Sequence, residues 1–125
     1  MPTEVKDYAY MTKTTPKHKP DCIFCKIANH ELESKIVLEN DDFLAFYDIR
    51  PVSQGHTLVV TKKHIDDFGH LVQEDADYLK RYLNFIEDVR RKIKKQHQPK
   101  GIKVTFNTDG LIEVWHVHCH LVPVY

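Results

Sequence analysis

The sequence predicts an α+β domain in which a five-stranded antiparallel sheet is accompanied by one long and one short helix. Three observations support this fold class. Five short stretches are rich in β-branched and aromatic residues and are separated by turn-forming residues. One long stretch carries apolar residues at helical spacing. The last stretch alternates histidines with apolar residues, a period of two that is typical of a strand.

The predicted elements follow in order along the chain. Asp21 is the expected N-cap of a short helix that carries Ile23, Phe24 and Ile27 on its apolar side. Apolar residues at three- and four-residue spacing predict a long amphipathic helix over about residues 75–97, acidic at its start and basic at its end. Strands are expected over residues 35–39, 43–49, 56–61 and 102–106 and in the histidine-rich stretch 114–123.

Length and composition fit one globular domain with no dominant charge. The chain has 125 residues, and its 18 basic side chains balance 18 acidic ones, so no overall field favours nucleic acid or a membrane surface. No apolar run approaches the roughly 18 residues that a membrane span needs. Residues 1–20 are polar and lack the apolar core of a signal peptide. We therefore expect a flexible extension over residues 1–20, an ordered domain over residues 21–125 and a cytoplasmic location, where cysteines stay reduced.

The histidine-rich stretch is the first candidate for a functional site. Alternate side chains of a strand share a face, so we expect His116, His118 and His120 on one side of the sheet. Neutral imidazole can act as a nucleophile, and neighbouring imidazoles can bind a phosphate or protonate a leaving group. The alternative is a half-exposed strand face without a function. The residues expected on the opposite, core-facing side are Trp115, Val117, Cys119 and Leu121.

Two cysteines indicate a second candidate site. Cys22 and Cys25 have the spacing of half a zinc site, and no strand precedes them as a thioredoxin-like redox motif requires. On a straight strand His116 and His120 are about 13 Å apart, which is too far for one zinc ion to bind the whole triplet. We therefore predict a structural Zn²⁺ bound by Cys22, Cys25, His64 and His116, with a reduced thiol pair as the alternative.

The stretch HVHCHLV at 116–122 resembles the signature of the histidine triad nucleotide-binding family. Three further blocks resemble that family in their order and spacing: CIFCKI at 22–27, FLAFYDI at 43–49, and GHTLVV at 55–60 with the KHI that follows. The resemblance extends from Cys22 to the C-terminus. It implies a five-stranded antiparallel sheet, a homodimer, a purine nucleotide ligand of the AMP type, and cleavage of phosphoramidates or dinucleoside polyphosphates at the α-phosphorus.

The same resemblance implies a role for each matching residue. His118 resembles the nucleophile that becomes nucleotidylated, while His120 and His56 resemble the histidines that contact the phosphate and assist the leaving group. Asp48 resembles the carboxylate that binds the ribose, and Asn107 the asparagine near the phosphate. The base pocket would be lined by Ile23, Phe24, Ile27, Phe46 and Ile49. The zinc ligands of the metal-carrying branch are matched by Cys22, Cys25, His64 and His116. Turn capping by Asp48 and plain core packing of the apolar residues are the alternatives.

One stretch departs from the family pattern. Where the family has Gly-Gln-Ser/Thr-Val before the triad, this chain has Leu111, Ile112, Glu113 and Val114. Isoleucine donates no hydrogen bond, and a carboxylate repels a phosphate unless it is screened or protonated. The loss of one donor from a preorganised site costs on the order of 10²–10³ in rate.

Three functions therefore remain open from the sequence. The first is a hydrolase or transferase that acts through His118. The second is a nucleotide-binding adaptor with weak or no turnover, because Ile112 and Glu113 replace the usual phosphate-binding residues. The third is a metal-centred enzyme with zinc on two of the triad histidines.

Overall fold

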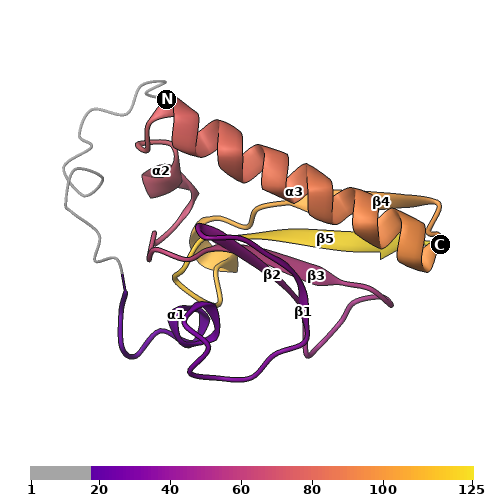
Figure 1. The fold of residues 1–125 in the computed structure, drawn as a ribbon, viewed down its shortest axis with the longest axis horizontal. Helices are drawn as coiled ribbons and strands as arrows, with labels where there is room; N and C mark the ends of the chain where they lie inside the picture. Colours follow the sequence, from indigo (N-terminus) through magenta and orange to yellow (C-terminus); the bar gives the residue numbers. More distant parts are fainter. Residues whose placement is uncertain (1–17) are drawn as a thin grey trace.

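One antiparallel sheet of five strands forms the centre of the domain, as the sequence predicts (Figure 1). The computed structural model describes residues 18–125, and most of the predicted extension, residues 1–17, lies outside the described residues. The spatial order of the strands is β1-β2-β3-β5-β4, so the C-terminal strand lies inside the sheet and β4 forms an edge. The strands are β1 (Ile36–Glu39), β2 (Phe43–Tyr47), β3 (Thr57–Thr61), β4 (Gly101–Thr105) and β5 (His118–Val124).

The long helix α3 (Ala76–His97) packs on one face of the sheet (Figure 1). Its bounds agree with the prediction, since the Asp75 side chain caps it by accepting a hydrogen bond from the Tyr78 N–H. The helix ends at Gln98, which has a left-handed backbone with a φ of 54°. The hydroxyl of Tyr82 donates to the Val59 carbonyl at 2.6 Å and so joins the helix to a central strand.

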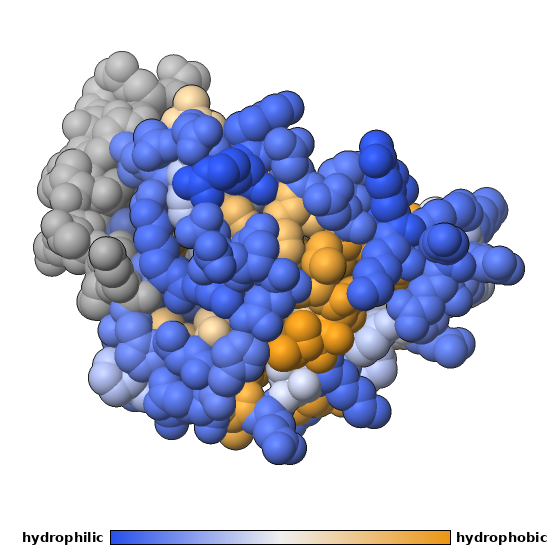
Figure 2. Space-filling model, in the orientation of Figure 1, coloured by the Kyte–Doolittle hydropathy of each residue, from blue (hydrophilic) through white to orange (hydrophobic). Residues whose placement is uncertain are grey.

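The central strands β2 and β3 are buried on both faces, because successive residues of these strands belong to two different apolar clusters. One set packs with α3 and includes Phe43, Ala45, Val59, Cys119 and Leu121. The other set packs with the short helix α1 (Ile23–Ala28), which lies on the opposite side of the sheet (Figure 1), and includes Leu44, Phe46, Leu58 and Val60. On the side seen in Figure 2, hydrophilic side chains cover most of the surface, and an apolar area lies over the sheet beside α3.

The start of α1 differs from the prediction. Its N-cap is Cys22 and not Asp21, because the Cys22 sulfur accepts the Cys25 N–H at 3.4 Å. The Asp21 side chain is exposed to solvent. Cys22 and Cys25 therefore both point into the domain from the first turn of the helix.

The histidine-rich stretch is also not one continuous strand. β5 begins at His118, and the preceding bend is held by hydrogen bonds from the Val117 N–H to the Ile65 carbonyl (2.6 Å) and from the His116 N–H to the Val114 carbonyl (2.9 Å). The expectation that His116 shares a face with the other two histidines is therefore wrong. The expectation that Trp115 lies in the core is wrong as well, because 51% of its surface is exposed.

The apolar spacing in the sequence does not predict two further short helices, because each is only about one turn long. α2 (Phe68–Leu71) is capped by the Asp67 side chain, which accepts the His70 N–H at 2.9 Å. A 3-10 helix, η2 (Asp109–Leu111), lies in the loop between β4 and β5. Among residues 18–125, no helix combines the length and the apolar character that crossing a bilayer requires.

Candidate active site and metal site

The sheet brings the histidines of one candidate site together. β3 and β5 are antiparallel neighbours in which Leu58 pairs with His120 and Val60 with His118. Both pairs lie on the face that packs with α1. His56 immediately precedes β3, and its Nε2 lies 3.0 Å from Nδ1 of His120. Three predicted site residues, His56, His118 and His120, therefore form one cluster.

His118 is held in the form that a nucleophile needs. Its Nδ1 lies 2.7 Å from the backbone carbonyl of His116, and a carbonyl can only accept a hydrogen bond. The neutral ring must therefore carry its proton on Nδ1, which leaves a lone pair on Nε2. Burial lowers the pKa of His118, and the hydrogen bond to the carbonyl offsets this only in part. The ring of Phe24 packs against the imidazole in an edge-on contact, with centroids 4.9 Å apart.

The other two histidines form a chain of hydrogen bonds with a fixed direction. The Val52 N–H donates to Nδ1 of His56 at 3.0 Å, so the neutral His56 ring carries its proton on Nε2. That N–H donates to Nδ1 of His120, which therefore presents its own proton on Nε2. Burial lowers the pKa of both rings. His120 thus offers an N–H group beside His118, and the amide of Asn107 lies 3.4 Å from that nitrogen.

Asp48 serves two purposes at the end of β2. One carboxylate oxygen accepts the Arg50 N–H at 2.9 Å, as the turn-capping alternative predicts. The other lies 3.6 Å from Nε2 of His56. The negative charge raises the pKa of His118 and His120, although burial has the larger and opposite effect. The turn therefore positions the carboxylate beside the histidine cluster.

The predicted base-pocket residues are not all in one place. Phe24, Ile27 and Phe46 are buried together in the α1 cluster. Ile23 is 44% exposed on the same helix, while Ile49 is 87% exposed. The structure therefore brings four of the five residues to α1 and the sheet face beneath it, and leaves Ile49 at the surface.

The predicted metal ligands converge at a second buried site. One ligand atom from each of Cys22, Cys25, His64 and His116 lies within 4.8 Å of all the others. Three of the distances between a cysteine sulfur and a histidine Nδ1 are 3.3–3.4 Å. A tetrahedral zinc ion with ordinary bond lengths needs ligand atoms about 3.3–3.8 Å apart. The donor set and its spacing therefore fit Zn²⁺.

The outer nitrogens of the two metal-site histidines support this assignment. Nε2–H of His116 donates to the Thr61 carbonyl at 2.6 Å, and Nε2–H of His64 donates to the Asp66 carboxylate at 2.7 Å. Both rings therefore direct the lone pair of Nδ1 toward the thiols, as metal-binding histidines do. Burial raises the pKa of Cys25 to about 11, so a bound cation is needed to hold its thiolate.

A second group of residues has ligand atoms close enough together for a metal ion, namely Asp48, His56 and His120. In this group the hydrogen bond at the outer ring nitrogen runs in the direction opposite to that in the Cys/His cluster. The outer nitrogen of His56 accepts an N–H from Val52 and does not donate to an oxygen. A metal ion on Nε2 would move the ring proton to Nδ1, directly against that N–H. The two clusters are therefore chemically distinct. The Cys/His cluster suits a metal ion, whereas the Asp/His/His cluster has a proton between its two imidazole rings.

Several groups that matter to these sites could not be found from residue types alone. The Val52 N–H and the Thr61 carbonyl belong to the backbone, which leaves no trace in the sequence. Asp66 is the exception, since a carboxylate two residues after His64 is a possible partner for a metal-bound imidazole.

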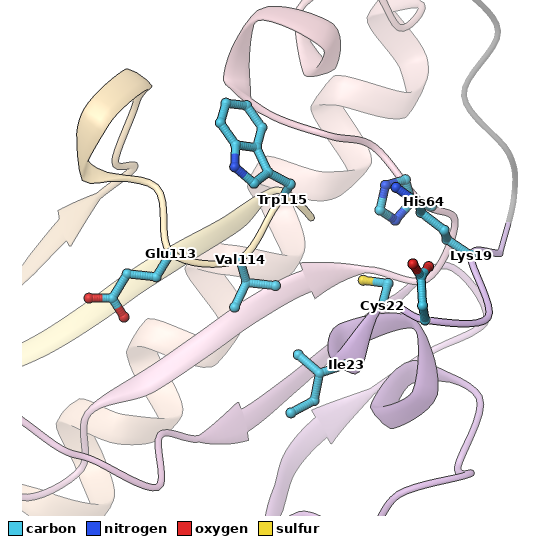
Figure 3. Close-up of a pocket in the computed structure, with 8 residues that line it drawn as sticks. Lys19, Cys22, Ile23, His64, Glu113, Val114 and Trp115 are labelled. Carbon is cyan, nitrogen blue, oxygen red and sulfur yellow. The ribbon is translucent and has the colours of Figure 1, made fainter.

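Residues of the segment 112–115 line two cavities. Ile112 and Val114 line a small cavity together with Asn107 and His118. The larger cavity is a pocket of about 290 Å³ between residues 113–115 and the region around the start of α1 (Figure 3). The residues that line this pocket are Lys19, Asp21, Cys22, Ile23, His64, Glu113, Val114 and Trp115.

Comparison with known proteins identifies the family. A family model described as the HIT domain matches residues 29–125. An uncharacterized HIT-like protein of Methanocaldococcus jannaschii is 39% identical over 109 residues, which cover 83% of this chain and 79% of the relative.

Solved structures agree with this match. The chain is similar to a HIT family hydrolase from Legionella pneumophila, with a TM-score of 0.72 and 34% identity over 82% of this chain and 91% of that chain. It is also similar to a hypothetical histidine triad nucleotide-binding protein from Sulfolobus tokodaii, with a TM-score of 0.75 and 34% identity over 83% and 69% of the two chains. Together with the family model, which matches most of the sequence, these similarities show that the chain belongs to the HIT family.

Proposed function

We propose that this protein is a nucleotide hydrolase or transferase that cleaves a purine nucleotide conjugate at its α-phosphorus through a nucleotidyl-His118 intermediate. The observation that carries the proposal is the 2.7 Å hydrogen bond from Nδ1–H of His118 to the His116 carbonyl, because it leaves Nε2 unprotonated. The names of two structural neighbours, a hydrolase and a nucleotide-binding protein, support the same reaction class.

In this proposal each residue of the cluster has a separate task. Nε2 of His118 attacks the α-phosphorus, and the bond to the leaving group breaks. Nε2–H of His120 donates to the phosphate as charge develops there, while His56 keeps the proton of His120 on that nitrogen. A water molecule then attacks the nucleotidyl-histidine, which releases the nucleotide and restores the lone pair of His118.

Substrate binding would use the groups around this cluster. The Asp48 oxygen that is not used by the turn is available to the ribose hydroxyls. Phe24, Ile27 and Phe46 form the apolar surface on which a purine can lie, with the half-exposed Ile23 at its edge. Ile49 can contact a base only from the loop after β2, since it is almost fully exposed. Asn107 lies close enough to His120 to assist at the phosphate.

An adaptor that binds nucleotides without turnover is the second candidate. Ile112 favours it, because this side chain lines the cavity beside His118 and offers no hydrogen-bond donor. The exposed carboxylate of Glu113 favours it as well. The two candidates differ in whether His118 forms a covalent adduct.

We also propose that the Cys/His cluster binds one structural Zn²⁺, which would cross-link α1 to the segments that follow β3 and precede β5. All three cysteines are free thiols, and thiolate ligands persist in a reducing compartment such as the cytoplasm. The metal would stabilise the fold around the active site without taking part in the reaction.

A homodimer completes the proposal. β4 is an edge strand, and Val104 on it is 48% exposed. A second copy that pairs along this strand would satisfy its free backbone groups and cover the apolar side chain.

The nucleophile can be tested by replacing His118 with alanine. With adenosine phosphoramidate or dinucleoside polyphosphates as substrates, we expect His118→Ala to lower kcat by a factor on the order of 10⁴. Intact-mass measurement of the wild type should detect an adenylylated protein that the variant does not form. His30→Asn is the matched control, because His30 is exposed and its left-handed backbone, with a φ of 61°, suits asparagine. Undiminished turnover in His118→Ala would contradict the mechanism, and AMP binding without an adduct would support the adaptor.

The metal site can be tested by elemental analysis. We expect about one zinc ion per chain, a large loss of zinc in Cys22→Ser, and a lower Tm after chelation, because metal binding contributes to folding. Cys119→Ala is the control, since that thiol is buried in the α3 cluster, on the other face of the sheet. A wild-type protein without zinc, or a Tm that chelators leave unchanged, would argue against the site.

The dimer can be tested by sedimentation equilibrium. We expect the wild type to have twice the mass of the chain, and Val104→Asp to shift the protein toward the monomer by placing a charge in the interface. Val72→Asp is the control, because Val72 is similarly exposed, at 47%, but lies after α2 and not on the sheet edge. A wild-type monomer at micromolar concentration would refute the proposal.

A further inference from the structure

The loop that follows β2 wraps around His56. The Asp48 N–H donates to the His56 carbonyl at 2.9 Å and closes the base of the loop. The His56 N–H donates to the Ser53 carbonyl at 3.1 Å, and the Val52 N–H donates to Nδ1 of the His56 ring at 3.0 Å. The direction of the hydrogen bond from His56 to His120 therefore depends on where the tip of this loop holds Val52.

Side-chain packing contributes little to the position of Val52. Its side chain is 77% exposed, and the side chain of Ile49 at the start of the loop is 87% exposed. Arg50, Pro51 and Gln54 are exposed as well. Because so little apolar surface is buried at the tip of the loop, the position of the Val52 N–H depends on hydrogen bonds.

The end of the loop next to β3 is held by close packing. Gly55 is buried and has a left-handed backbone with a φ of 88°. A Cβ atom at this position would lie 3.0 Å from the ring of His97 at the end of α3. The close approach of this ring confines Gly55. The tip of the loop, residues 50–54, therefore needs an attachment of its own.

Ser53 attaches the tip of the loop to the C-terminal strand. It is half-buried, and its hydroxyl donates to the Pro123 carbonyl at 2.5 Å. On β5 the pairing with β3 ends at Leu121, so Pro123 lies beyond the paired stretch. The Tyr125 hydroxyl adds a second hydrogen bond, to the Gln54 carbonyl at 2.6 Å. Two hydroxyl groups thus join the tip of the loop to the strand that carries two of the clustered histidines.

We propose that Ser53 is a positioning residue of the active site, which fixes the ring proton of His56 through the backbone of Val52. Its hydroxyl holds the tip of the loop on β5, and this keeps the Val52 N–H directed at Nδ1 of His56. Without that bond Nδ1 loses its donor for part of the time, and the His56 ring exchanges its proton between its two nitrogens. Nε2–H of His120 is then directed at the phosphate in only a fraction of the molecules. The effect on the ring proton is independent of the reaction, whereas the effect on turnover rests on the proposed function.

The ring proton of His56 can be followed by long-range ¹H–¹⁵N NMR at neutral pH in the wild type and three variants. In Ser53→Ala we expect at least about a tenth of the His56 rings to carry the proton on Nδ1, because the loop has lost one hydrogen bond. For the same reason, hydrogen exchange of the Val52 N–H should be about three- to tenfold faster. Ser53→Thr keeps the hydroxyl and should give the wild-type spectrum. Ser34→Ala is the matched control, since this half-buried serine precedes β1 and lies outside the loop.

Turnover of adenosine phosphoramidate supplies the second measurement. We expect Ser53→Ala to lower kcat about three- to tenfold and to leave KM within about twofold, because Asp48 and the apolar surface of α1 stay in place. A His56 ring in Ser53→Ala that keeps its proton on Nε2 would overturn the positioning role, whatever the Tm of the variant. A shift of the proton that Ser53→Thr shows as well would also overturn it. A shifted ring proton in Ser53→Ala, together with a wild type that cleaves no substrate, would support the positioning role and refute the proposed function alone.

Discussion

The hydrogen bond from the His118 ring to the His116 carbonyl connects the two sites of this domain. His116 contributes its side chain to the Cys/His cluster, and its backbone carbonyl accepts a hydrogen bond from the His118 ring. The bend that begins at Val114 allows His116 to contribute to both sites, because it turns the His116 ring inward before β5 starts. The position of the His118 ring therefore depends on a residue whose own side chain belongs to the Cys/His cluster.

Helix α1 also links the Cys/His cluster to the His118 ring. It presents Cys22 and Cys25 to the metal site, and between them Phe24 contacts the His118 ring. The apolar side chains of β2 and β3 beneath the helix pack against it and fix its position. A helix of six residues has little stability of its own, so packing and the proposed zinc ion must hold it in place.

The sequence predicts the elements well because their signals are local. The apolar spacing and the Asp75 cap define α3, and the Cys22–Cys25 spacing with His64 and His116 predicts the four members of the Cys/His cluster. The tautomers of His56 and His118 could not be predicted, since they depend on the Val52 N–H and the His116 carbonyl. The inward turn of His116 was missed for a related reason: the backbone bond from Val117 to Ile65 joins segments far apart in the chain.

Backbone groups fix the positions of the ring protons of His118 and His56, and NMR of the ring nitrogens can observe these protons directly. Long-range ¹H–¹⁵N correlation at neutral pH should show His118 as a neutral ring protonated on Nδ1 and His56 as one protonated on Nε2. Titration should give a pKa for His118 below its ordinary value of 6.5, because the ring is buried. A neutral His118 ring protonated on Nε2, or a His118 pKa at or above 6.5, would contradict this assignment of the ring protons.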